Sequence, residues 1–183
     1  MMSSNLFHAA ISKPRVSVVI PVRNGKDYLQ EALDSVLQQS FTDLELLLIN
    51  DGSTDDDYDR YALQDDRIRV INLTGTGVSR ARNVGMAQSR GELIAFLDAD
   101  DVWFPGKLLA QVKYFDSHPE AGVVYGKFIR WAPLPEGGFV PASALAEDAS
   151  RFTAADPDRS GWLYTRLIDG LLVGMNTAVV HRS

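Results

Sequence analysis

Three carboxylates directly follow a short apolar run in this chain of 183 residues. Residues 93–97 are apolar, and Asp98, Asp100 and Asp101 come immediately after them. Such a run is typical of a strand buried on both faces, and ligands of an open parallel sheet bind beyond the carboxyl ends of such strands. Carboxylate oxygens suit Mg²⁺ or Mn²⁺. The tripeptide Asp98–Ala99–Asp100 therefore indicates a site for a metal-bound diphosphate.

A purely structural interpretation of the same acids stays open. Pro105 is typical of the first residue of a helix. Acidic residues placed before a helix can cap its free backbone N–H groups. In that case the carboxylates would stabilise a helix start and bind no ligand. The tripeptide by itself does not decide between the two interpretations.

A second predicted strand, residues 44–49, also ends in a carboxylate, Asp51, within the segment 50–55. A turn followed by a helix cap would explain Gly52 and Ser53 adequately. The functional alternative is that Asp51 accepts a hydrogen bond from a base or a ribose at the carboxyl edge of the sheet. Two acid-terminated strands in one sheet favour a site.

The segment 75–82 resembles the glycine-rich start of a dinucleotide-binding helix, because Gly75 and Gly77 follow a predicted strand. Arg80 occupies the position of the third glycine of the dinucleotide-binding pattern. The next predicted strand also lacks an acidic residue at the position that would bind a ribose. These departures exclude a nicotinamide or flavin site. Cations are unfavourable at a helix N-terminus. We therefore expect Arg82 to face the acidic cluster or a phosphate, whereas Arg80 is equally compatible with solvent.

Strands and helices alternate along the chain, which predicts an α/β fold with a mostly parallel sheet and helices on both faces. Strands are expected at 16–22, 44–49, 68–73, 93–97, 122–131 and 177–181. Helices are expected at 29–37, 54–64, 78–88, 105–117 and 162–172, and a long loop at 133–161. Residues 1–14 are expected to form a leader, and 15–183 a single domain.

Composition narrows the classes of partner and compartment. The net charge of -6 and the pI near 5.0 argue against nucleic acid as a partner. A bound divalent metal would explain how an acidic chain tolerates an anionic ligand. The absence of cysteine excludes disulfides and thiolate zinc sites. No signal peptide or membrane-spanning run is recognisable, so a cytoplasmic location is the expectation.

Four segments together resemble the family 2 inverting glycosyltransferases of GT-A fold, in order and in spacing. They are Val-Ser-Val-Val-Ile-Pro-Val-Arg-Asn at 16–24, Asn-Asp-Gly-Ser-Thr-Asp at 50–55, Gly-Val-Ser-Arg-Ala-Arg-Asn-Val-Gly at 77–85 and Phe-Leu-Asp-Ala-Asp-Asp at 96–101. The likeness extends from Val16 to Tyr125. It implies a Rossmann-like three-layer sandwich that binds a nucleotide-sugar donor.

The resemblance also implies roles for particular residues. Asp51 would contact the nucleobase, Asp98 the ribose and Asp100 the divalent ion, Mn²⁺ or Mg²⁺. The remaining positions would lie beside the nucleotide: Pro21, Val22, Arg23, Asn24, Arg82 and Ala99. The donor implied is a UDP-sugar, and the acceptor is a glycan or a lipid-linked sugar.

Members of that family carry their general base in an acidic motif after the strand that corresponds here to 177–181. No residue up to Ser183 matches it, so the base and the acceptor side are expected outside this sequence, as is any membrane association. The chain alone is then expected to bind the donor and to transfer little sugar. Two alternatives remain: a non-catalytic nucleotide-sugar-binding module, and a nucleotidyltransferase. The latter would need a glycine-rich phosphate loop, which 21–24 is not.

Overall fold

The computed structural model describes residues 13–128, 134–136 and 174–182. Its strands form one mixed sheet in the order β3-β2-β1-β4-β6-β5. The strands are β1 Val16–Val22, β2 Leu44–Asp51, β3 Ile68–Leu73, β4 Leu93–Phe96, β5 Val123–Val124 and β6 Val179–His181. The helices are α1 Lys26–Leu37, α2 Val78–Gln88 and α3 Lys107–Ser117, with short 3₁₀ turns η1 Tyr58–Leu63 and η4 Met175–Thr177.

The first four strands run parallel, as their alternation with helices predicts. β1 pairs in parallel with both β2 and β4, and β2 pairs in parallel with β3. β6 pairs antiparallel with β4 and with β5. The carboxyl ends of β1, β2, β3 and β4 therefore meet at one edge of the sheet.

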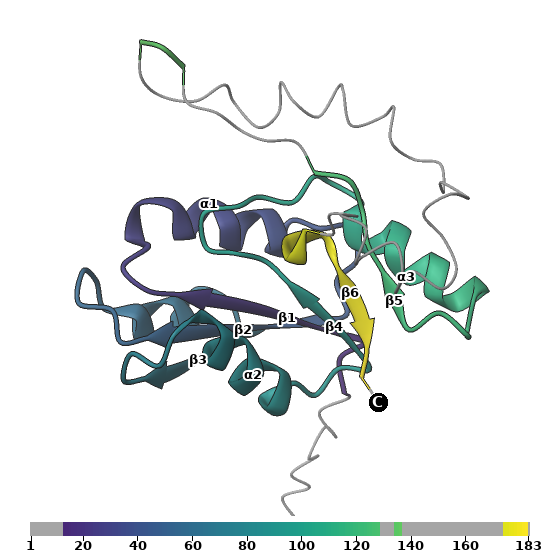
Figure 1. Cartoon of the computed structure of the whole chain (residues 1–183), viewed down its shortest axis with the longest axis horizontal. Helices are drawn as coiled ribbons and strands as arrows, with labels where there is room; N and C mark the ends of the chain where they lie inside the picture. The colour runs from purple at the N-terminus through teal and green to yellow at the C-terminus, as the bar shows by residue number, and fades with distance from the viewer. Residues whose placement is uncertain (1–12, 129–133, 137–173, 183) are drawn as a thin grey trace, which may run out of the picture.

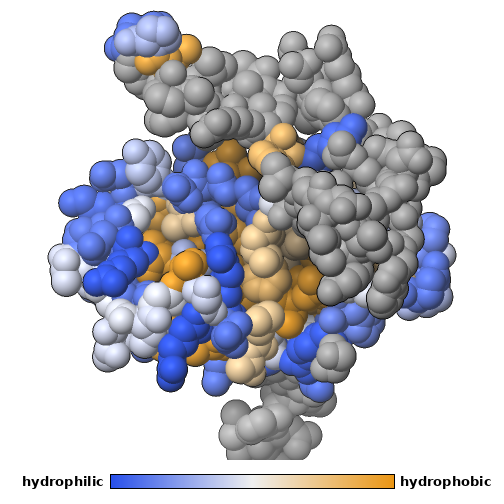
Figure 2. All heavy atoms as spheres, in the orientation of Figure 1, coloured by the Kyte–Doolittle hydropathy of each residue, from blue (hydrophilic) through white to orange (hydrophobic). Residues whose placement is uncertain are grey.

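Helices cover both faces of the sheet (Figure 1). On one face, α1, α3 and η1 pack over side chains such as Val18 and Ile20 of β1, whereas α2 packs over Val19 on the other face. Side chains of a strand alternate between faces, so the unbroken apolar sequence of β1 supplies both cores. In Figure 2 the hydrophobic residues visible on this face gather in the middle of the molecule, with hydrophilic residues around them.

Gly85 explains how α2 approaches the sheet so closely. A Cβ atom at this position would lie 2.3 Å from Cγ1 of Val19, which no real side chain tolerates. Glycine is therefore required at the helix–strand contact, although it costs about 1 kcal/mol of helix propensity.

Several predicted boundaries are wrong. The expected helix 54–64 is only the 3₁₀ turn η1, and the expected strand 122–131 is reduced among its described residues to the two residues of β5. α3 begins at Lys107 rather than Pro105, because Gly106 is left-handed with φ of 81° and a helix cannot run through it. β4 ends one residue early, at Phe96. The expected helix 162–172, most of the loop 133–161 and most of the leader 1–14 lie outside the described residues.

Candidate functional site

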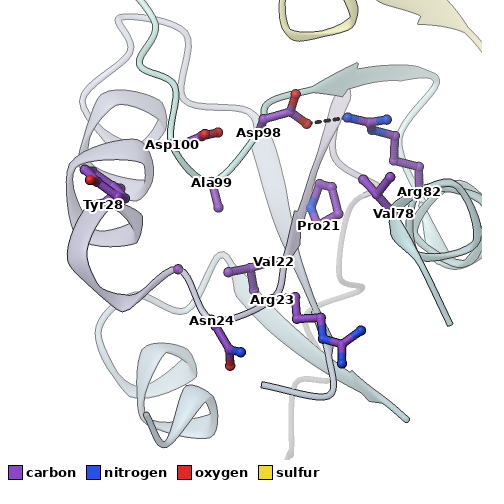
Figure 3. A pocket seen from close by; sticks show the side chains of 11 residues that line it. Pro21, Val22, Arg23, Asn24, Tyr28, Val78, Arg82, Asp98, Ala99 and Asp100 are labelled. Carbon is purple, nitrogen blue, oxygen red and sulfur yellow. Dashed lines mark hydrogen bonds and ion pairs between the residues drawn. The ribbon is translucent and has the colours of Figure 1, made fainter. Parts of the chain in front are cut away.

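Two adjoining hollows lie at the carboxyl edge of the parallel strands. The first, of about 350 Å³, opens between α1 and α2 (Figure 3) and is lined by Pro21, Val22, Arg23, Asn24, Gly25, Tyr28, Val78, Arg82, Asp98, Ala99 and Asp100. The second, of about 290 Å³, is lined by Pro21, Val22, Arg23, Asp51, Gly77, Val78 and Ala81. The hollows share part of β1 and its following loop, and together they contain every site residue named from the sequence.

Asp51 occupies the second hollow and holds the loop that precedes α2. Its carboxylate is only 3% exposed. Oδ1 accepts hydrogen bonds from the backbone N–H and the hydroxyl of Thr76 at 2.6 and 3.0 Å, and Oδ2 accepts one from the N–H of Gly77 at 2.7 Å. These bonds, the Thr76 N–H first, hold the pKa of Asp51 below its usual range, and the nearby charge of Arg23 adds to the effect. The carboxylate of Asp51 therefore binds the loop that precedes α2, and not a helix that follows its own turn.

Three loops meet at this point. Gly52 has a φ of 76°, and a Cβ there would lie 2.9 Å from the backbone nitrogen of Gly75. The guanidinium of Arg23 lies on the other side of Gly75, with Nη1 3.7 Å from the position of a Cβ. The absence of a Cβ at Gly52 allows the loops after β2 and β3 to touch, and Asp51 and Arg23 both line the second hollow.

Arg82 reaches from α2 to the end of β4, where its Nη2 lies 2.5 Å from Oδ1 of Asp98 (Figure 3). The expectation that Arg82 faces the acidic cluster is confirmed. Arg80 is exposed and lines neither hollow. The ion pair places a cation and an anion side by side in the lining of the first hollow.

The three acids after β4 have different surroundings. Asp98 pairs with Arg82, Asp100 is exposed at the first hollow, and Asp101 accepts a hydrogen bond from Asn176. Burial, together with the charges of Asp100 and Asp98, raises the pKa of Asp101. Within the part of the chain that the structure describes, no three acidic, histidine or cysteine side chains are grouped to hold a metal.

The helix-cap interpretation of these acids is wrong. α3 starts after Gly106, which has no side chain to cap it, and the N–H of Leu108 in its first turn donates to Oε1 of Gln39 at 3.2 Å rather than to one of these acids. The segment 98–101 instead forms its own turn, in which the N–H of Asp101 donates to the carbonyl of Asp98 at 3.1 Å. The acids are therefore free of any role in starting α3.

The donor set at the first hollow fits a divalent ion that is shared with a substrate. Mg²⁺ is usually held by one or two carboxylates together with substrate phosphates and water, rather than by a complete protein cage. Asp98 and Asp100 supply two carboxylates at the hollow.

Two residues at the site were missed from the sequence. Tyr28 lines the first hollow and is 51% exposed, although it is aromatic. It stands beside the buried stripe of α1, and its position one turn after the loop 23–25 was the available signal. Asn176 donates a hydrogen bond to Asp101 in the acidic turn, although the two residues are 75 positions apart in the sequence. Nothing in the sequence around Asn176 signals that contact. Trp103, two residues after Asp101, is buried.

The architecture is that of the GT-A glycosyltransferases. S. aureus TarS shares it with a TM-score of 0.55 and 26% identity, over 65% of this chain and 41% of that one. A mannosyltransferase of Pyrobaculum calidifontis, solved with GDP-Man and Mn²⁺, has a TM-score of 0.58 and 26% identity, over 65% and 37% of the two chains. TarS has also been solved with UDP-GlcNAc, and that structure is similar in fold.

The chain belongs to Glycosyl transferase family 2, whose family model matches residues 17–133. An uncharacterised glycosyltransferase of Nostoc is 41% identical over 115 residues, which make up 61% of this chain and 36% of the relative. The chain thus spans little more than a third of that relative's length. No helix among the described residues is long and apolar enough to cross a membrane.

Proposed function

We propose that the chain is the donor-binding part of an enzyme that transfers a sugar from a nucleoside diphosphate to an acceptor hydroxyl, with inversion at the anomeric carbon. The observation that carries the proposal is the gathering of Asp51, Arg82, Asp98 and Asp100 around two adjoining hollows at one sheet edge. These residues come from three separate elements of the chain, and only the fold joins them.

The nucleobase would occupy the second hollow, beside Asp51 and Arg23. Asp51 already accepts three hydrogen bonds from residues 76 and 77, two at Oδ1 and one at Oδ2. The base would therefore use the remaining lone pair of Oδ2, on a carboxylate that is fixed in place. The ribose would lie toward Asp98, and the diphosphate toward Asp100 and Arg82. UDP is the proposed nucleotide, because TarS binds UDP-GlcNAc, although the mannosyltransferase binds GDP-Man.

In the proposed reaction, an acceptor oxygen forms a bond to the anomeric carbon while the bond to the diphosphate oxygen breaks. A general base removes the proton of the acceptor hydroxyl. A bound Mn²⁺ or Mg²⁺ would neutralise charge on the departing diphosphate. Asp100 would hold the ion, and Arg82 would orient Asp98 and add positive charge at the hollow.

The proposal assigns the donor half of the reaction to the residues of the two hollows, and it assigns the general base, the acceptor and any membrane contact to no described residue. The division into a leader 1–14 and a donor-binding domain 15–183 also stays a prediction. A non-catalytic nucleotide-sugar-binding module would share the donor site and differ only in lacking the base. A nucleotidyltransferase is less well supported, because the loop after β1 carries Arg23 and Asn24 rather than a glycine-rich phosphate cradle.

Calorimetry of the 183-residue chain with UDP, in the presence and absence of Mn²⁺, tests the proposal. We expect Mn²⁺ to strengthen UDP binding and EDTA to reverse that gain, and we expect Asp100→Asn to remove the effect of Mn²⁺. Asp116→Asn is the matched control, because Asp116 is an exposed acid on α3 that lines neither hollow. UDP affinity that EDTA leaves unchanged would contradict the proposal.

A further inference from the structure

One hydrogen bond connects the acidic turn to a distant part of the chain. The side-chain amide of Asn176, in the turn η4, donates from Nδ2 to Oδ2 of Asp101 at 2.5 Å. Because the carboxylate can only accept, the orientation of the amide is determined by its partner. The contact ties the segment that leads into β6 to the segment that leaves β4.

A second bond reinforces the first. The indole Nε1 of Trp103 donates to the backbone carbonyl of Asn176 at 2.8 Å, and the backbone N–H of Trp103 donates to Oγ of Ser35 on α1 at 3.1 Å. The ammonium of Lys107 lies 3.7 Å from the centre of the indole ring, and in the described part of the chain it has no hydrogen-bond partner. Trp103 is thus fixed by Ser35 and Lys107, and its indole N–H in turn fixes the backbone of Asn176.

The turn η4 is itself well anchored. Thr177 donates from its N–H and its hydroxyl to the carbonyl of Gly174 at 2.9 and 2.8 Å, which closes the turn. Its own carbonyl accepts from Nε2 of Gln111 on α3 at 2.9 Å. Asn176 therefore acts from a fixed support.

The bond from Asn176 has a direct effect on the residues at the first hollow. Asp101 closes the turn 98–101 through its N–H bond to the carbonyl of Asp98. Fixing the side chain of Asp101 therefore fixes the backbone between them, which carries Ala99 and Asp100. It also turns the third carboxylate of the cluster away, since Asp101 lines neither hollow.

We infer that Asn176 is a positioning residue, which holds the turn 98–101 so that Asp98 and Asp100 present their carboxylates to a divalent ion and a diphosphate. The effect of Asn176 on metal and diphosphate binding rests on the proposed function, whereas its hydrogen bond to Asp101 does not. Residues that orient metal ligands without touching the metal typically contribute 10- to 100-fold to metal affinity. The same bond makes the donor site depend on the turn η4, which is far from the acidic turn in the sequence.

The test is an exchange of the two bonded groups. Asn176→Asp places two carboxylates against each other and should separate them. Combining it with Asp101→Asn restores a hydrogen bond in the opposite direction, from an amide at 101 to a carboxylate at 176. Asp101→Asn alone keeps an amide–amide bond. Ser89→Ala is the control, because it removes a buried side-chain hydrogen bond to Gly85 at the other edge of the sheet.

We expect Asn176→Asp to reduce the gain in UDP affinity on adding Mn²⁺ by about tenfold or more. UDP affinity without metal should change less than about twofold, and the double variant should restore the gain. NMR should show faster amide exchange at Asp101 in Asn176→Asp, with the exchange slowed again in the double variant. The indole N–H signal of Trp103 reports whether η4 remains folded, because its acceptor is a backbone carbonyl that the substitution keeps.

The two proposals can fail separately. If the unmodified chain shows no metal-dependent UDP binding, the proposed function fails, and amide exchange at Asp101 alone decides the role of Asn176. Unchanged exchange and unchanged metal dependence in Asn176→Asp would overturn the inference. So would a double variant that keeps the indole signal but restores neither property. If Asn176→Asp loses the indole signal, Asn176→Ala gives the same comparison without the added charge.

Discussion

Arg82 on α2 and Asp98 after β4 form an ion pair in the lining of the first hollow, with Nη2 and Oδ1 2.5 Å apart. Their side chains are 21% and 37% exposed, so solvent screens the pair and it adds little to stability. Its place at the hollow suits ligand binding better. Under the proposed function, the guanidinium would offset negative charge where an anionic ligand approaches Asp98 and Asp100.

The first prediction concerns this pair. Arg82→Ala should weaken UDP binding in the presence of Mn²⁺ about tenfold or more, because a hydrogen bond to a charged group is typically worth about 1.5–3 kcal/mol. The free energy of unfolding should fall by less than about 1 kcal/mol. Calorimetry and urea denaturation measure the two quantities. Arg80→Ala, on the same helix but at neither hollow, is the control, and equal losses in the two variants would contradict the assignment.

The second prediction concerns Asp51. Asp51→Asn replaces one of two accepting oxygens by an NH₂ group, which leaves an N–H of the loop 76–77 without its acceptor. The free energy of unfolding at neutral pH should fall by about 1–3 kcal/mol. Urea denaturation measures this free energy. Asp57→Asn is the control, because the exposed carboxylate of Asp57 also accepts a hydrogen bond from a backbone N–H, that of Asp59. A loss no larger than in the control would show that the loop does not depend on the carboxylate.

The pH dependence of Asp51 follows from the direction of its pKa. The pKa is lowered in the folded state from the usual 3.8, so the unfolded chain binds a proton more readily. The stabilisation is therefore fully present well above pH 3.8 and is lost as the pH falls through the lower folded-state pKa. Urea denaturation at acid pH should show a smaller loss in Asp51→Asn than in the unmodified chain. Parallel acid profiles would contradict this expectation.

The third prediction concerns the contact between α2 and β1. Gly85→Ala should lower the free energy of unfolding by about 1–3 kcal/mol, because the new methyl group would overlap Val19 in a closely packed core. Helix propensity alone would predict the opposite sign, a gain of about 1 kcal/mol. Thermal or urea denaturation decides between the signs. Gly122→Ala, where a Cβ meets nothing within 4 Å, is the control.

Apolar runs and their spacing were enough to predict most of the sheet. β1 and β3 have the predicted bounds, and α2 begins and ends where the pattern indicated. The start of α3, which was predicted wrongly, depends on a single backbone conformation. Gly106 delays α3 by adopting a left-handed conformation, which the sequence permits but does not require.

The sequence by itself determined that acids would stand at the carboxyl ends of two strands, because apolar runs specify buried strands and their alternation with helices makes them parallel. It did not reveal that β1 separates those strands, or that β6 enters the sheet antiparallel beside β4. Only the tertiary structure decided the partners of each acid. Asp51 bonds to Thr76 and Gly77, and Asp101 to Asn176, because strand order brings together groups that no local periodicity connects.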